Sequence, residues 1–455
     1  MQRIEAGSPL QNRYVWVVAF LGGVLAVFVR WYFVAHAQVL QPVNEAGEWG
    51  DAAEYYRYAW NLVHHRMFSA DLAGTAHPTS DSFRDPGYPA FLAFLMAVTS
   101  SYQQWYGVVI LSQVLIGGLT VTFATLAIRH AVPLWLLALA ALVMSLWPHL
   151  VTMPAYILSE NLSGLLCALL ALLLGEAVRR NATGYIFVAG LTLAAAALTN
   201  AVVVPLVVPL VIVFAWKRTM SRQDMALLIA VTALPLFAWG IRNSAISTET
   251  SSSYRAEINL VQGSWPTYHA ATRLWARHDP VGAQTIDAIN REIAVLHSDR
   301  IRGLGLMAER MSAAPASYLA WYIRKPALLW GWTIELGAGD IYVYPTRDSP
   351  FVTKLPLRIV EEIAFVFNDI LALFALAGVI IVTTRPSPNA ALVTFAVTCA
   401  WATLVYALLQ SDARYAIPFR TGEIAMASVA VAQAVAYIRR RRSLASPNLP
   451  PSQAS

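Results

Sequence analysis

Long apolar segments dominate the pattern of hydrophobic and polar positions along the chain. A membrane-spanning helix needs about 20 predominantly apolar residues, and the segments that approach or exceed this length are 14–36, 105–128, 131–150, 155–178, 184–216, 225–246, 363–384, 390–410 and 421–438. Thr199, Asn200 and Pro205 interrupt 184–216, which is too long for one crossing. It therefore predicts two short helices, 184–199 and 201–216, in a tight hairpin. The pattern as a whole predicts an all-α polytopic membrane protein with about ten spans.

One further apolar segment, 86–101, is ambiguous, and the distribution of basic residues decides how it lies. Cytoplasmic loops of membrane proteins carry an excess of Lys and Arg. If 86–101 stays in the outer interface, all the short basic segments fall on one side of the membrane: Arg3 and Arg13, Arg129, Arg179 and Arg180, Lys217, Arg218 and Arg222, Arg385, and Arg439 to Arg442. We therefore expect 86–101 not to cross, and both termini to be cytoplasmic.

Composition and charge support a membrane protein. Of the 455 residues, 57% are apolar and 13% are charged, against about 45–50% and about 25% in soluble domains. These values exclude a soluble enzyme, a disordered regulator and a nucleic-acid-binding protein. The net charge of +6 is explained by the cytoplasmic loops. Cys167 and Cys399 both lie in apolar segments and predict neither a disulfide framework nor a metal site.

Two long polar regions divide the chain. We expect an N-terminal transmembrane module over 1–246 with an outer loop at 37–104 and an outer domain over 247–362 that contains a helix-like stretch at 282–311. C-terminal transmembrane helices over 363–442 and a disordered cytoplasmic tail over 443–455 follow. Ala35-His36-Ala37 resembles a signal-peptide cleavage site. The preceding apolar stretch is longer than a usual signal peptide, so we expect a retained anchor in the inner membrane.

Asp51 opens an amphipathic helix just beyond the first span, and two interpretations compete for it. Asp51 with Glu54 is typical of an N-cap and capping box. Alternatively, a carboxylate at the level of the lipid headgroups can act as a general base. Asp85, which precedes Pro86, is expected to be an N-cap as well.

Further ionisable residues lie at the outer ends of different predicted elements. Ionisable groups in or near the membrane are candidates for function, and those on the outer side are Asp51, Arg84, Glu160, Arg242 and Arg414. Asp369 is also intramembrane, and we expect it to make a helix-packing hydrogen bond.

Several short motifs, taken in order, resemble one known family. They are RDPGYPAFLAF at 84–94, LSEN at 158–161, IRN at 241–243 and DARYAIP at 412–418. With the outer-loop Asp51, they resemble the type C glycosyltransferases (GT-C), a superfamily that includes bacterial aminoarabinose transferases and protein O-mannosyltransferases. The resemblance covers nearly the whole chain through span order and loop placement, although the motifs themselves are short and degenerate.

The resemblance implies a catalytic site that faces the periplasm and a sugar donor carried on polyprenyl phosphate. It implies that Asp51 is catalytic and that Glu160 is a second acidic residue that organises the site. It implies donor-phosphate contacts by Arg84, Arg242, Arg414 and Tyr415, and donor or acceptor contacts by Glu54, Tyr55 and Tyr88. Some relatives bind a divalent metal through an acidic D-x-D motif where this chain has Ser159-Glu160-Asn161, so a metal cofactor stays open.

The predicted function is transfer of a sugar, with inversion, from the lipid carrier to an envelope acceptor: lipid A or its core, a glycan, a glycolipid or a protein hydroxyl. A leaving phosphate needs charge stabilisation and no general acid, because its second pKa lies near 6; guanidinium groups supply such stabilisation. A lipid-linked sugar flippase and a non-catalytic envelope scaffold remain alternatives. We find no internal repeat of the kind that transporters show, and the polar residues gather at one face.

Overall fold

The computed structural model describes residues 9–43, 50–246, 251–385 and 389–445, and most of the residues in these ranges are helical. Arg3 and the end of the predicted cytoplasmic tail lie outside them. A short antiparallel pairing joins β1 (Gln38–Val39) to β2 (Thr346–Arg347). This pairing connects the end of the first span to the segment before α17.

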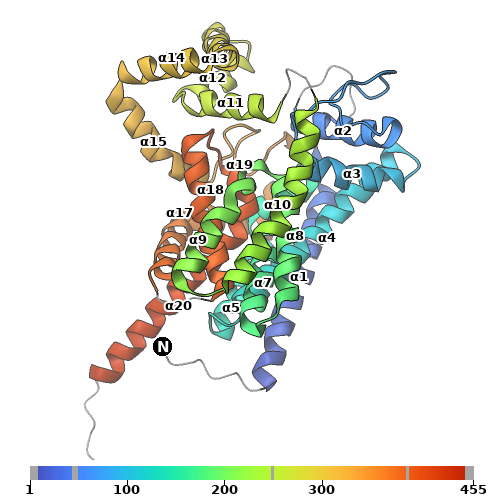
Figure 1. Cartoon of the computed structure of the whole chain (residues 1–455). Helices are drawn as coiled ribbons and strands as arrows, with labels where there is room; N and C mark the ends of the chain where they lie inside the picture. The colour runs from blue at the N-terminus through green and yellow to red at the C-terminus, as the bar shows by residue number, and fades with distance from the viewer. Residues whose placement is uncertain (1–8, 44–49, 247–250, 386–388, 446–455) are drawn as a thin grey trace, which may run out of the picture.

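Seven helices among the described residues are long and apolar enough to cross a membrane. They are α1 (Pro9–His36), α4 (Tyr102–Ile128), α7 (Glu160–Arg180), α10 (Arg222–Ser244), α17 (Leu355–Thr384), α18 (Ala390–Leu408) and α20 (Arg420–Ala445), the last taken together with α19 (Ala413–Ala416) and η3 (Ile417–Phe419). They stand side by side in one bundle (Figure 1). The chain is therefore a multi-pass, all-α membrane protein, as its apolar pattern predicted.

Three further apolar elements bear on the predicted count of ten spans. The described residues hold up to eight spans if one bent pair is counted as a single span: α5 (Leu134–Leu146) followed by α6 (Pro148–Thr152) and η1 (Met153–Ala155), with a bend of 53°. The segment 184–216 forms α8 (Thr183–Thr199), η2 (Ala201–Leu206) and α9 (Val207–Lys217), broken where the sequence predicted. These two helices are shorter than a usual span, so the count of ten stays a prediction.

The ambiguous segment 86–101 contains α3 (Gly87–Ala97), a helix of 11 residues. At 1.5 Å per residue it is about 16 Å long, too short to cross a hydrocarbon core of about 30 Å. It packs beside α2 (Asp51–His65) at one end of the bundle (Figure 1). This length is consistent with a helix that lies in the interface and does not cross.

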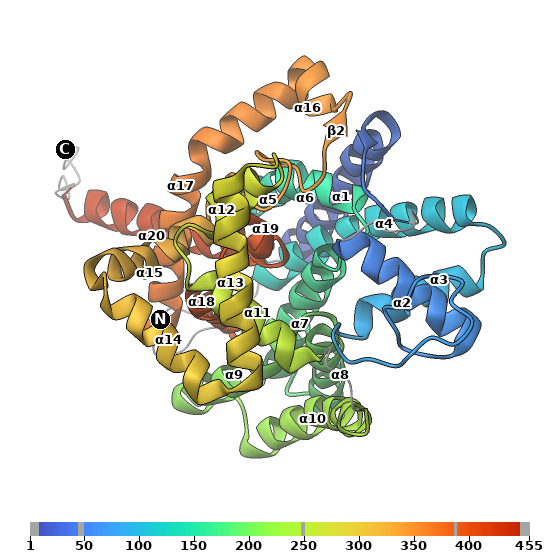
Figure 2. The ribbon, with the colours of Figure 1, turned by 90° about the horizontal axis from the view of Figure 1, so that it is seen from above.

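The helices of the predicted outer domain gather at the same end of the bundle as α2 and α3 (Figures 1 and 2). They are α11 (Ser252–Gly263), α12 (Tyr268–Trp275), α13 (Pro280–Ser298), α14 (Arg300–Ser312), α15 (Pro315–Leu329) and α16 (Pro350–Thr353). A small apolar core of their own holds α11, α13 and α14 together, with Val261, Ile289 and Met307 among its buried members.

Two element boundaries differ from expectation. The helical stretch read over 282–311 is two helices, because Asp299 ends α13 and caps α14 by accepting a hydrogen bond from the Arg302 amide at 3.0 Å. α17 begins at Leu355, before the predicted span start at 363. Its first turns therefore belong to the region that the sequence assigned to the outer domain.

Candidate functional site

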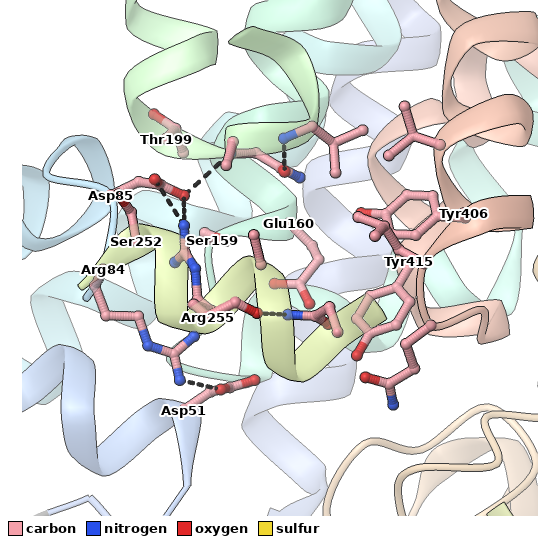
Figure 3. A pocket seen from close by; sticks show the side chains of 18 of the residues that line it. Asp51, Arg84, Asp85, Ser159, Glu160, Thr199, Ser252, Arg255, Tyr406 and Tyr415 are labelled. Carbon is pink, nitrogen blue, oxygen red and sulfur yellow. Dashed lines mark hydrogen bonds and ion pairs between the residues drawn. The ribbon is translucent and has the colours of Figure 1, made fainter. Parts of the chain in front are cut away.

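A pocket of about 520 Å³ lies where the outer helices meet the bundle. Residues of six chain segments line it: α2, the loop before α3, the start of α7, the break between α8 and η2, helix α11, and the connection from α18 to α20. Figure 3 shows Asp51 and Arg84 at one side of this pocket, Asp85 and Arg255 at another, and Tyr406 and Tyr415 facing them. Segments distant in sequence thus contribute to one site.

Asp51 is the first residue of α2, and its side chain does not cap the helix. The N-cap is Gly50, whose φ of 136° lies where an L side chain is strained. Asp51 instead faces two guanidinium groups. Its Oδ1 accepts a hydrogen bond from Arg84 Nη2 at 2.6 Å, and its Oδ2 accepts one from Arg414 Nη2 at 2.5 Å. The capping-box interpretation of Asp51 and Glu54 is therefore wrong.

Each of the two arginines also holds a second carboxylate. Arg84 Nε donates to Glu54 Oε2 at 2.6 Å, and Arg414 Nε donates to Glu160 Oε1 at 2.5 Å. Three carboxylates and two guanidinium groups thus alternate in one row, with Asp51 at its centre. We call these five residues the Asp51 cluster. The Asp51 side chain keeps 27% of its surface exposed, the largest share in the cluster.

Local structure brings Arg414 and Glu160 to this point. Arg414 lies on the short helix α19, which Asp412 caps by accepting a hydrogen bond from the Arg414 amide at 2.8 Å. The other Asp412 oxygen accepts from the Glu335 amide at 2.9 Å, so α19 is tied to the segment after α15. Glu160 is the first residue of α7, directly after the bent stretch that contains Pro148 and Pro154.

Tyr415 lines the pocket beside Arg414, and its ring stacks on Tyr406 with ring centroids 5.1 Å apart and planes 5° from parallel. Tyr55 also lines the pocket, and its hydroxyl donates to Ser159 Oγ at 3.3 Å. Both side chains thus line the pocket near the Asp51 cluster.

The two arginines control the acidity of Asp51. Burial alone would raise the pKa of its carboxyl, but the charges and hydrogen bonds of Arg84 and Arg414 outweigh burial and hold this pKa well below its ordinary value. A carboxylate held in this way is a weak base. Its proton affinity would rise if the guanidinium groups turned away from it.

A second ion pair, missed by the sequence analysis, faces the same pocket. Arg255 of α11 donates through Nη2 to both oxygens of Asp85 at 2.8 Å (Figure 3). Asp85 also accepts a hydrogen bond from the Ala201 amide at 3.0 Å, while the N-cap of α3 is Pro86. Asp85 therefore links α11 to the break after α8, and the expectation that it caps α3 is wrong.

Other predicted site residues lie outside the pocket lining. Arg242 donates to the carbonyl oxygens of Asp81 and Phe68, at 2.5 and 3.4 Å, and so fastens the outer loop. Tyr88 is fully buried and donates to Gln113 Oε1 at 3.1 Å.

Two acidic residues also have other roles than expected. Glu54 reaches the site only through Arg84. Asp369 is exposed and accepts a hydrogen bond from its neighbour Asn368, so it is not the interhelical packing contact expected.

The carboxylates of the site do not form a metal-ligand set. Each pocket-facing oxygen of Asp51 has a guanidinium partner, and Glu160 is joined to Arg414. Within the described ranges, no group of three or more His, Cys, Asp or Glu side chains could hold a metal ion. Guanidinium groups thus hold both oxygens of Asp51 and one oxygen of Glu160.

No family model and no curated protein matches this chain. Solved structures do resemble it. The Archaeoglobus fulgidus oligosaccharyltransferase in the apo form matches with a TM-score of 0.50 at 13% identity, over 96% of this chain and 52% of that one. ArnT from Cupriavidus metallidurans, solved bound to undecaprenyl phosphate, matches with a TM-score of 0.38 at 14% identity, over 96% of this chain and 81% of that one.

This chain spans about half the length of the oligosaccharyltransferase. At such low identity the likeness concerns the fold alone, and it is the fold that the motifs of the sequence indicated. The chain therefore shares the fold of this oligosaccharyltransferase over 96% of its length.

Proposed function

We propose that this protein is a membrane glycosyltransferase that moves a sugar from a polyprenyl-phosphate carrier to a hydroxyl group of an envelope acceptor. The observation that carries the proposal is the position of Asp51. A potential general base lies between two guanidinium groups, at the wall of a pocket of about 520 Å³. A base and an anion site side by side are what sugar transfer from a phosphate requires.

The guanidinium groups of Arg84 and Arg414 would bind the phosphate of the donor. In the free protein they hold the two oxygens of Asp51, 2.6 and 2.5 Å away. The phosphodiester of the donor carries one negative charge on two non-bridging oxygens, a geometry that suits the planar donor fork of arginine. The phosphate monoester that leaves has three such oxygens and up to two charges. Donor phosphate would therefore compete with Asp51 for both arginines.

This competition would convert Asp51 into a base when it is needed. Arg84 and Arg414 hold the pKa of Asp51 low in the free protein. Each guanidinium that turns toward the donor phosphate removes part of that effect, so the pKa of Asp51 rises in the complex. During the exchange Glu54 would keep its contact with Arg84, and Glu160 would keep its contact with Arg414.

The chemical step is a single displacement at the anomeric carbon. The oxygen of the acceptor hydroxyl forms a bond to this carbon, its proton passes to Asp51, and the bond from the carbon to the phosphate oxygen breaks. The phosphate leaves with the electron pair, and Arg84 and Arg414 stabilise its charge. One displacement inverts the configuration of the anomeric carbon.

The proposed setting is the outer face of the inner membrane, with both termini in the cytoplasm. The basic segments of the sequence support this orientation. A donor held in the membrane by its polyprenyl chain would present its phosphate at the level of the interface. The acceptor classes stay those that the sequence left open.

The test compares cells that contain the parent protein, the Asp51→Asn variant or neither. We expect mass spectrometry of envelope lipids and glycans to show species heavier by one sugar only with the parent, and lipid-linked sugar to accumulate in the other two strains. A flippase or a scaffold predicts parental products with Asp51→Asn. Identical products in all three strains would refute the proposal.

A further inference from the structure

A second, much smaller cavity lies directly behind Glu160, inside the bundle. Its volume is about 10 Å³, and residues of α1, α4, α6, η1, α7, η3 and the start of α20 line it. This space is at the lower limit for one water molecule. Glu160 lines both this cavity and the large pocket, so the two spaces share one carboxyl group.

Three polar side chains that line the cavity each have a buried atom with no hydrogen-bond partner among the described residues. The atoms are Glu160 Oε2, Arg30 Nε and Thr421 Oγ1. The residues are 6%, 2% and 2% exposed. The large majority of buried side-chain polar atoms in proteins have a hydrogen-bond partner, so three unpartnered atoms around one cavity point to a small ligand that bonds them.

The chemistry of the three atoms defines this ligand. Glu160 Oε2 accepts hydrogen bonds, Arg30 Nε donates one, and the Thr421 hydroxyl can do either. A water molecule can donate to the carboxylate, accept from the guanidinium and bond the hydroxyl at the same time. A buried water typically makes about three such bonds.

We propose that this cavity binds one structural water that bridges Glu160, Arg30 and Thr421, and that Arg30 thereby positions Glu160. Glu160 would then be held on both sides, by Arg414 through Oε1 and by the bridged Arg30 through Oε2. Arg30 is thus a positioning residue for the Asp51 cluster. This consequence for catalysis rests on the proposed function, whereas the water site does not.

The surroundings of Arg30 hold its Nε at the cavity. Its terminal nitrogens donate to the carbonyl oxygens of Ser145 at 3.1 Å and Met144 at 3.3 Å, at the end of α5. Gly117 of α4 makes room for the side chain, because a Cβ there would lie 2.5 Å from Arg30 Nε. The terminal nitrogens of Arg30 are therefore held by the end of α5, and its Nε packs against Gly117 of α4.

The direct test of the water site is a high-resolution cryo-EM map of the purified protein in nanodiscs, without donor. We expect density for one water within hydrogen-bond distance of Glu160 Oε2, Arg30 Nε and Thr421 Oγ1. A dry cavity, or direct contact of Arg30 with Glu160, overturns the proposal. This readout needs no turnover, so it stands even if the protein transfers no sugar.

Two substitutions at Thr421 separate hydrogen bonding from packing. Thr421→Val keeps the shape and removes the hydroxyl, and Thr421→Ser keeps the hydroxyl. We expect Thr421→Val to lower kcat about fivefold, the effect of one ordinary hydrogen bond, with the KM for the donor unchanged, and Thr421→Ser to keep the parental kcat. Parental kcat in Thr421→Val, or an equal loss in both, would show that the bridge does not position Glu160.

A glycine pair on α4 tests the role of Arg30 without changing it. Gly117→Ala would push Arg30 Nε from the cavity, whereas Gly107→Ala adds its methyl group to open space. We expect kcat to fall at least fivefold in Gly117→Ala and to stay parental in Gly107→Ala. If Gly117→Ala folds and keeps the parental kcat, Arg30 is not a positioning residue.

Discussion

Single residues at the outer ends of the spans were the part of the site that the sequence could reveal. Asp51, Arg84, Glu160 and Arg414 are charged groups at the edge of an apolar solvent, where unpaired charge is costly. Their partners could not be predicted, because Asp51 pairs with residues 33 and 363 positions away. The local sequence favoured a helix cap for Asp51. In the structure its carboxylate bonds to these distant arginines and caps no helix.

Arg255 shows the same limit. It is separated by 170 positions from Asp85, its partner at the pocket, and no local pattern around it distinguishes it from a surface arginine of an outer helix. Arg242 shows the converse, because its position at the end of a span suggested a phosphate ligand. Its contacts are with backbone carbonyls of the outer loop, which hydropathy does not encode.

The arginine pair predicts a characteristic pH dependence. In the free protein Arg84 and Arg414 hold the pKa of Asp51 well below its ordinary value, so kcat/KM for the donor should not fall on the acid side until far below pH 4. In the donor complex the pKa of Asp51 rises, so kcat should begin to fall at a higher pH. Acid limbs of kcat and kcat/KM that coincide would contradict competition between phosphate and Asp51.

Arg414 is expected to contact both Asp51 and the donor phosphate. Arg414→Lys keeps the charge but cannot hold Asp51 and Glu160 through one planar fork. We expect kcat/KM for the donor to fall about 10- to 100-fold, from the loss of one or two charged hydrogen bonds.

Arg242→Lys is the matched control for this variant, because Arg242 contacts loop carbonyls outside the pocket. It should lower thermal stability slightly and leave donor kinetics unchanged. The measurement is kcat/KM for the purified donor in both variants. An equal fall in both would contradict a specific contact between Arg414 and the donor phosphate.

At the scale of elements, apolar periodicity predicted most helices and placed the break in 184–216 at Asn200, which caps η2 by accepting a hydrogen bond from the Val202 amide at 3.1 Å. Over 282–311 it predicted helical structure but not the division at Asp299, where a new helix starts. The spacing of apolar residues indicates that a segment is helical. It does not indicate where a single capping side chain ends one helix and starts another in a new direction.

The packing of the outer helices on the bundle depends on a buried lysine. Lys325 of α15 is fully buried, and its Nζ donates to the carbonyl oxygens of Gly263 at 2.9 Å, Leu408 at 3.4 Å and Leu409. Lys325→Met would leave these carbonyls without their donor. We expect a loss of about 1–3 kcal/mol of stability, seen as a lower apparent melting temperature in detergent.

The neighbouring Arg324 is exposed and supplies the control. Arg324→Met should change stability by no more than about 0.5 kcal/mol. If both variants melt at the parental temperature, Lys325 does not fasten α15 and α11 to the end of α18.

At the scale of the whole molecule, composition and span order predicted the class of fold, because lipid selects helices of a minimum length and charge sorts their loops. The site joins parts of the chain that are far apart in sequence, with Asp51 in the N-terminal part and Arg414 in the C-terminal part. Its place at one end of the bundle explains why polar candidates gathered on one face in the sequence.

The proposed membrane topology places α3, which is too short to cross, at the outer interface. Single cysteines introduced as Gln103→Cys and His130→Cys replace exposed side chains on opposite ends of α4. In intact cells an impermeant thiol reagent should label position 103 and not position 130. The native Cys167 and Cys399 are buried and should give little background. Protection at 103 with labelling at 130 would reverse the proposed orientation.

The central claim is that Asp51 takes the proton of the acceptor, and one substitution tests it most directly. Asp51→Asn keeps the shape of the side chain but cannot accept the proton. Transfer from purified lipid-linked sugar to acceptor is measured beside thermal stability. Asp279→Asn is the control, because Asp279 caps α13 and asparagine caps a helix equally well.

We expect Asp51→Asn to fold with a melting temperature close to that of the parent and to lose about 10²-fold or more in kcat, while Asp279→Asn keeps parental activity. Full activity in Asp51→Asn, or a loss confined to the KM for the donor, would contradict the account and leave Asp51 as a partner of Arg84 and Arg414 only.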